Sequence, residues 1–183
     1  NAQSLGQGKG AGDAGNIVVT AQRVTLTEGG VIVSNTLGPG QGGTVTVIAT
    51  DAVRLAGASP DGSRTSGIAS QATGDREGAG DAGDVVVTAP RVMLTGGAGI
   101  SSSTFGSGQG GTVTVIATDV VNLSGTNSNG LTSAITSNAI GESKGAGDAG
   151  NSSDGRTAAT NATVRTVFII APDKSIKATL YYP

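Results

Sequence analysis

The sequence predicts an all-β protein, folded as a right-handed parallel β-helix of about four to five coils with a C-terminal β-hairpin. Three features predict it: the chain repeats itself, apolar and polar residues alternate, and glycine-rich breaks separate the alternating segments. Residues 12–51 and 80–119 are identical at 29 of 40 aligned positions, at an interval of 68 residues. Such repetition is typical of a solenoid, propeller or tandem array rather than of a single globular core.

The repeat also predicts the domain organisation. Residues 1–150 form the solenoid, with units at 12–79 and 80–146 and a partial third unit from 147. The third unit opens with the same G-D-A-G motif but continues with polar residues. Residues 151–183 are predicted to be a linker and a β-hairpin or cap.

Within a unit, the strands are predicted from period-two alternation. Ile17, Val19 and Ala21 are expected on one face, and Val18 and Thr20 on the other. The same alternation runs through the rest of the unit at Val24 and Leu26, Ile32 and Ser34, Val45, Val47 and Ala49, Val53 and Leu55, and Ile68 and Ser70. Three such strands, separated by corners, would make one coil.

Each unit is expected to hold two coils, a short one at 12–41 and a longer one from 42 to about 79. The breaks between strands, rich in Gly, Asp and Asn, are expected to supply positive-φ positions for tight corners. The extra length of the long coils falls at 57–67 and 125–134, where the two units differ most. Such variable insertions are typical of external loops.

Stacking is expected to be parallel, because an antiparallel meander would show Asn-Gly or Asp-Gly hairpin turns at the strand junctions. Val45 and Val113 should then lie in line along the axis, two coils apart, as should Leu55 and Leu123. Each coil adds about 4.8 Å, so the rod would be on the order of 20 Å long.

Composition excludes several function classes. The chain has 32 glycines, no cysteine, histidine or tryptophan, and a formal net charge of -2. A nucleic-acid site needs clustered Lys and Arg, and a membrane span needs roughly 18 apolar residues, so neither partner is expected. The absence of cysteine excludes disulfides, thiolate zinc sites and thiol catalysis. No cofactor is predicted.

The recurring carboxylates are the candidate chemistry. Asp13, Asp81 and Asp148 recur in the G-D-A-G corner and could form a calcium-binding row. The favoured interpretation is that each accepts backbone N–H groups within its own turn. Asp51 and Asp119 repeat in the same way and are also assigned a turn role. No cluster of Asp, Arg and Lys indicates a catalytic groove, so we expect no enzyme.

Two outward-facing features are weaker candidates for binding. The outward threonines of the T-V-T-V motifs at 44–47 and 112–115 could form a flat ladder that resembles an ice-binding face, although threonine is simply a good solvent-facing strand residue. A sugar-binding platform needs exposed aromatic rings. The solenoid part offers only Phe105.

The C-terminal segment is predicted to form a hairpin, with strands at 164–170 and 175–182 and a type I turn at Pro172 and Asp173. It is too apolar to stand alone in water. Its candidate cap or assembly residues are Val167, Phe168, Ile169, Ile170, Leu180 and Tyr182. The hairpin either folds back as the chain's own cap, which is favoured, or docks on the exposed N-terminal coil of a neighbour and so builds a filament.

Two resemblances are carried by these motifs. The pattern G-x-A-G-x-[IV]-x-V-x-A-x-x-V-x-L followed by G-Q-G-G-T-V-T-V-x-A-T-D, over about 5–150, resembles the repeats of filamentous haemagglutinin-type exoproteins of the two-partner secretion route. That resemblance implies a right-handed parallel β-helix, export across an outer membrane, and adhesion or surface structure. Residues 164–183 are similar to a hairpin of one-cysteine peroxiredoxins, but the cysteine on which that chemistry depends is absent.

The resulting expectation is a non-enzymatic, extracellular structural or adhesive β-helix segment, secreted or on a bacterial cell surface. It would self-associate head to tail through the C-terminal hairpin, and its other partner would be a host or surface carbohydrate or protein receptor. The alternative is a carbohydrate-binding or polysaccharide-active β-helix.

Overall fold

The computed structural model describes residues 1–6, 11–74, 79–140, 168–170 and 176–179. These residues form parallel strands stacked as a β-solenoid of about four turns, which confirms the predicted fold class. The strands are β1 (Ala2–Ser4), β2 (Ile17–Thr27), β3 (Val31–Thr36), β4 (Val45–Ala56), β5 (Gly67–Thr73), β6 (Val85–Thr95), β7 (Gly99–Phe105), β8 (Val113–Ser124), β9 (Ala134–Ile140), β10 (Phe168–Ile170) and β11 (Ile176–Thr179).

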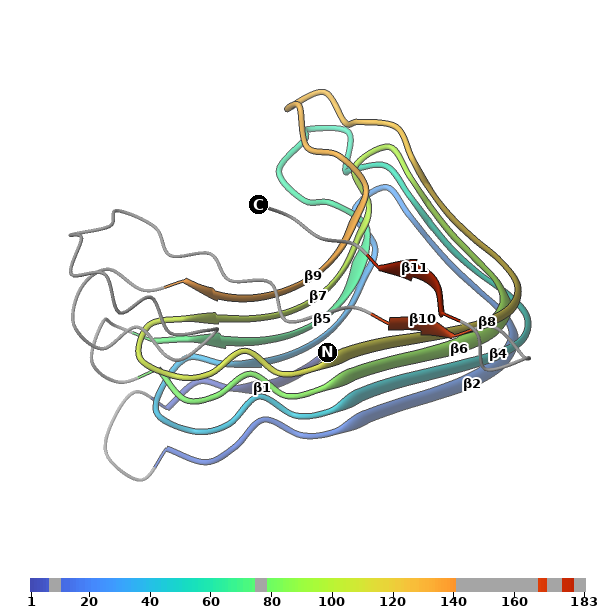
Figure 1. The fold of residues 1–183 in the computed structure, drawn as a ribbon. Coiled ribbons are helices and arrows are strands. Elements are labelled where there is room, and N and C mark those ends of the chain that lie inside the picture. The colour runs from blue at the N-terminus through green and yellow to red at the C-terminus, as the bar shows by residue number, and fades with distance from the viewer. Residues whose placement is uncertain (7–10, 75–78, 141–167, 171–175, 180–183) are drawn as a thin grey trace, which may run out of the picture.

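The strands form two sheets that face each other across one interior (Figure 1). The short strands make a five-stranded sheet in the order β1-β3-β5-β7-β9, here called sheet A. The long strands make a six-stranded sheet in the order β11-β10-β8-β6-β4-β2, here called sheet B. One long strand and the following short strand make a coil, so coils 1 to 4 are β2–β3, β4–β5, β6–β7 and β8–β9.

The register confirms the predicted stacking. Val45 pairs with Val85, which pairs with Val113, so the first and last lie in line two coils apart. The structure differs in one respect from the prediction of three strands per coil. The first two predicted strands run as a single strand that bends at a corner. At this corner Ala21 pairs with Ala49 and Arg23 with Ala52, so β4 carries one residue more than β2.

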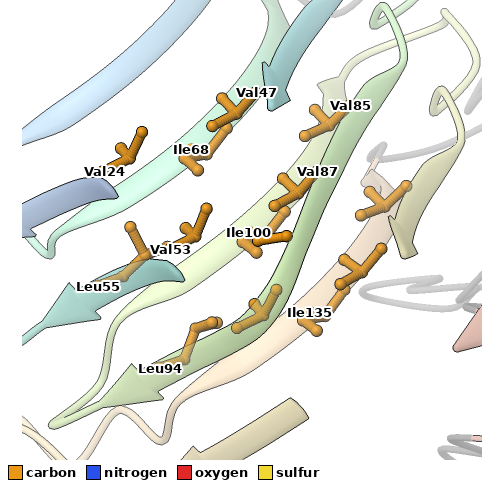
Figure 2. Packing of buried hydrophobic residues seen from close by; sticks show 14 of the residues in the cluster. Val24, Val47, Val53, Leu55, Ile68, Val85, Val87, Leu94, Ile100 and Ile135 are labelled. Atoms are coloured by element: carbon orange, nitrogen blue, oxygen red, sulfur yellow. The ribbon is translucent and has the colours of Figure 1, made fainter. Parts of the chain in front are cut away.

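The core is aliphatic and continuous along the axis, and both sheets point side chains into it (Figure 2). In the two central coils, Val45, Leu55 and Leu94 are at most 1% exposed. Alternation places these residues inside and their neighbours outside, as the period-two pattern predicts. Aligned aliphatic columns therefore fill the space that neighbouring coils share.

The glycines at the corners have two different roles. At the turn between β2 and β3, Glu28 and Gly29 have φ angles of 54° and 78°, so this corner does use positive φ as predicted. Among the described residues, the glycines of the G-D-A-G and G-Q-G-G motifs do not have positive φ angles. A Cβ atom on Gly43 would collide with the carbonyl oxygen of Gly15 in the preceding coil, and one on Gly83 with that of Gly43. Gly43 and Gly83 therefore allow neighbouring backbones to touch.

The extra length of the long coils forms two projecting loops (Figure 1). Each loop closes with an antiparallel bridge, from Ala58 to Thr65 in coil 2 and from Thr126 to Thr132 in coil 4. The Asn129 side chain donates to the Gly62 carbonyl at 2.9 Å, so the two loops contact each other across the intervening coil.

The C-terminal hairpin is present in the described backbone. β10 pairs antiparallel with β11 and parallel with β8, with Phe168 opposite Thr114 and Ile170 opposite Ile116. At the other end, β1 pairs with β3 over Ser34–Thr36. Each end of the solenoid therefore has one sheet partly covered by a short strand. The predicted turn at Pro172 and Asp173 lies outside the described residues.

Candidate functional site

A column of serines connects sheet A to the glycine-rich corner. This corner is formed by the G-D-A-G and G-Q-G-G segments, which precede the long strands. Ser34, Ser70, Ser102 and Ser137 share one register position and are at most 2% exposed. The Ser102 hydroxyl donates to the Gly83 carbonyl at 2.9 Å and accepts from the Gly111 N–H at 2.9 Å. A hydroxyl can donate and accept at once, so this buried serine is satisfied by two backbone groups of the corner.

The described carboxylates of the candidate calcium row accept backbone N–H groups, as the favoured interpretation predicts, but not those of their own turn. Asp13 accepts the Gln41 N–H at 2.8 Å, and Asp81 accepts the Gln109 N–H at 2.7 Å. The carboxylates thus bind the backbone of the next coil rather than of their own turn, because parallel stacking brings that coil closer. Asp148 lies outside the described residues. Within the part of the chain that was searched, no three Asp or Glu side chains come together as a metal site.

Asp51 forms a charged bridge across three coils. It lies at the extra corner residue of β4 and makes ion pairs with Arg23 in coil 1 and Arg91 in coil 3. The hydrogen bond from Arg23 is the largest cause that holds the pKa of Asp51 below its usual value. The predicted turn role is therefore incomplete for Asp51, since its side chain also joins coils. Asp119 holds the equivalent place in coil 4.

The projecting loops are held by their own polar groups. Asp61 accepts from the Ser59 hydroxyl at 2.5 Å and from the Ser63 N–H at 3.1 Å. The hydrogen bond from Ser59, followed by those from Ser63, lowers the pKa of Asp61 to about 2. In the second loop, Asn127 accepts the N–H groups of Asn129 and Leu131. Both loops are ordered around one side-chain oxygen.

The outward face of sheet B is built from β-branched residues. Two columns of outward side chains run across the four coils, on the part of each long strand that precedes its bend. These two columns are here called the outer face. They contain Val18, Thr46, Val86 and Thr114, and Thr20, Ile48, Thr88 and Ile116. Val18 is 70% exposed and Ile48 is 40% exposed. The threonine ladder considered for the T-V-T-V motifs at 44–47 and 112–115 is thus interrupted, because Val18 and Val86 alternate with Thr46 and Thr114 in the first column.

Both ends of the solenoid leave core columns incompletely covered. Leu55 and Leu94 are buried, but Leu26 in coil 1 and Leu123 in coil 4 occupy the same column and are only partly buried. The candidate assembly residues Phe168, Ile169 and Ile170 form β10 at the C-terminal end. Val167, Leu180 and Tyr182 lie outside the described residues.

Two functional features were missed from the sequence. The serine column was visible as Ser34 and Ser102, which recur 68 residues apart at an inward position. Arg23 and Arg91 recur in the same way, and their alternation with Asp51 along the chain could have indicated a bridge between coils. A repeated polar residue in the inward phase of a strand is the signal to follow.

Comparisons with family models, with curated proteins and with solved structures find no match for this chain. A search of the described residues for a helix long and apolar enough to span a membrane finds none.

Proposed function

We propose that this chain is a segment of a non-enzymatic extracellular rod with a structural or adhesive role, whose copies join head to tail at the C-terminal hairpin. The observation that carries the proposal is that the repeated polar residues form contacts between successive coils. Asp13, Asp51 and Asp81 join one coil to the next, as do the buried Ser34, Ser70 and Ser102. Residues that recur in this way serve the length and stiffness of a rod.

The extracellular setting, secreted or at a bacterial surface, follows from the resemblance to haemagglutinin-type exoprotein repeats. The chain offers two broad surfaces for a carbohydrate or protein receptor. One is the outer face of sheet B, and the other is the pair of contacting loops at 57–66 and 125–133. Leu131, on the second loop, is 55% exposed. Exposed apolar residues on a rigid support favour contact with another surface.

An adhesion assay tests the proposal. Beads coated with the chain are expected to attach to cell or polysaccharide surfaces under flow, and the same preparation is expected to release no reducing ends from polysaccharides. Val18→Ser and Leu131→Ser alter the two surfaces separately at exposed positions, so each serves as the control for the other. Sugar release would contradict the proposal and favour the alternative of a polysaccharide-active β-helix.

A further inference from the structure

The two ends of the solenoid are near copies of two surfaces that already meet inside it. At the C-terminal end, β8 of coil 4 repeats the sequence of β4 without change over residues 113–119. At the N-terminal end, β2 of coil 1 repeats β6 except at Ile17, Gln22 and Thr25. Since β4 and β6 are neighbours in sheet B, the ends carry the two halves of a contact that the chain already makes.

The three differences between β2 and β6 leave the inward surface intact. None of them introduces a charge, and the one at an inward core position is conservative, because Ile17 replaces Val85. Leu26 is the same residue type as Leu94 in the same column. The N-terminal end therefore keeps the aliphatic surface that β6 presents to β4.

Equivalent side chains would meet if coil 4 of one copy stacked on coil 1 of the next. Inside the chain, β4 presents to β6 a row of aliphatic side chains along the strand, and this row is almost fully buried. Its members are Val45, Val47, Ala49, Val53 and Leu55. On β8 the equivalent residues are Val113, Val115, Ala117, Val121 and Leu123, and on β2 the residues to receive them are Ile17, Val19, Ala21, Val24 and Leu26.

Charge complementarity also repeats at the ends. Inside the chain, Asp51 of coil 2 pairs with Arg91 of coil 3. The equivalent pair between copies is Asp119 of coil 4 with Arg23 of coil 1 in the next copy. A carboxylate and a guanidinium placed in register favour one orientation and oppose the reversed one.

The strands that cover these ends are short. β10 pairs with only Thr114–Ile116 of the twelve-residue β8, and β1 pairs with only Ser34–Thr36 of β3. Inside the chain, the β4 register with β6 extends from Val45 to Ala56. A full coil would therefore bury more of the incompletely covered column than either short strand does, and buried apolar surface is a main source of affinity between such faces.

We infer that a second copy of this chain docks its coil 1 on coil 4, so that the solenoid continues from copy to copy, and that the β10–β11 hairpin is the removable cover of that site. The inference rests on the proposed head-to-tail assembly, but it replaces the hairpin with coil 4 as the contact surface. The hairpin then limits assembly, because its pairing with β8 competes with β2 of the incoming copy and reduces the fraction of chains that can bind.

Ile169→Pro in the full-length chain tests the cover. Proline removes the N–H of the central residue of β10 and weakens its pairing with the neighbouring strands. We expect the protein concentration for half-assembly, measured by sedimentation velocity, to fall by about tenfold or more relative to wild type. Ile169→Val keeps the strand and is the control. If Ile169→Pro assembles no better than Ile169→Val, the inference is wrong.

A charge exchange tests the docking surface against non-specific aggregation. Asp119→Arg and Arg23→Asp, each combined with Ile169→Pro, should each lose self-assembly, because like charges then meet at every joint. Mixed in equal amounts, the two variants should assemble again. One kind of joint in the mixture brings together the two exchanged charges, which are of opposite sign, and the other kind is the native pair of Asp119 with Arg23.

Recovery in the mixture alone therefore reports a specific contact between coil 4 and coil 1. Assembly of either charge variant by itself to the level of Ile169→Pro would overturn the docking surface.

The axial repeat of the assemblies separates this inference from the broader proposal. A joint of coil on coil adds four strands of sheet B per copy, or about 19 Å along the axis. A joint bridged by the hairpin adds six strands, or about 29 Å. A repeat of about 29 Å that is lost in Ile169→Pro would overturn the inference and leave head-to-tail assembly standing. Monomers in every variant would contradict both.

Discussion

On the side of sheet B, neighbouring coils meet through aliphatic side chains, whereas at the corner beyond sheet A they meet through backbone and serine hydroxyls. Leu55 and Leu94 represent the first kind of contact, and Ser102 with Gly83 and Gly111 represents the second. Aliphatic columns tolerate modest changes of shape. At Gly43 and Gly83 the corner leaves no space for a side chain, so these positions should be less tolerant of substitution than the aliphatic columns.

The largest effect is expected from a side chain placed in the corner. In Gly83→Val, the new Cβ would collide with the carbonyl oxygens of Gly42 and Gly43, which belong to backbone and cannot rotate away. We expect a loss of about 4 kcal/mol or more in the free energy of unfolding, measured by urea denaturation. Gly12→Ala is the control, because a Cβ there meets nothing within 4 Å. Equal effects of the two would contradict the close-approach role.

A cavity in the aliphatic column should cost somewhat less. Leu94 is fully buried in coil 3, so Leu94→Ala should lower the free energy of unfolding by about 3 kcal/mol. Leu26→Ala changes the same column at the N-terminal end, where the side chain is only partly buried, and should cost less. Urea denaturation of both variants measures the difference. If Leu26→Ala costs as much as Leu94→Ala, the ends are covered as well as the middle.

The same contrast explains what could be predicted from the sequence. The aliphatic side could be predicted, because alternation places Val45 and Leu55 inside whatever their partners are. The corner could not, because the need for Gly83 and the partner of Asp13 depend on the distance to the neighbouring coil, which no local pattern contains. Glycine was therefore assigned to positive φ, and Asp13 to its own turn. Asp51 was assigned to a turn for the same reason.

Loss of one serine hydroxyl should have an intermediate effect. Ser102→Ala leaves the Gly111 N–H and the Gly83 carbonyl without their partner in a buried place. We expect a loss of about 1 to 3 kcal/mol in the free energy of unfolding. Ser101→Ala, at the neighbouring position on the opposite side of β7, is the matched control and should change little. Thermal and urea denaturation that fail to separate the two would show that the hydroxyl does not hold the corner.

The smallest effect is expected outside both contacts, in the projecting loop of coil 2. Hydrogen bonds from Ser59 and Ser63 lower the pKa of Asp61 to about 2 in the folded protein, against an ordinary value of about 3.9 in an unfolded chain. A lowered pKa means that the ionised carboxylate stabilises the fold above about pH 4, and that this contribution is lost as pH falls from about 4 to about 2. In Asp61→Asn this part of the pH dependence should disappear, because an amide oxygen does not titrate. The loop around Asn127 is already organised by such a neutral oxygen. Free energies of unfolding of both proteins between pH 7 and pH 2 measure it. Parallel pH profiles would show that the ionisation of Asp61 does not contribute to the stability of the fold.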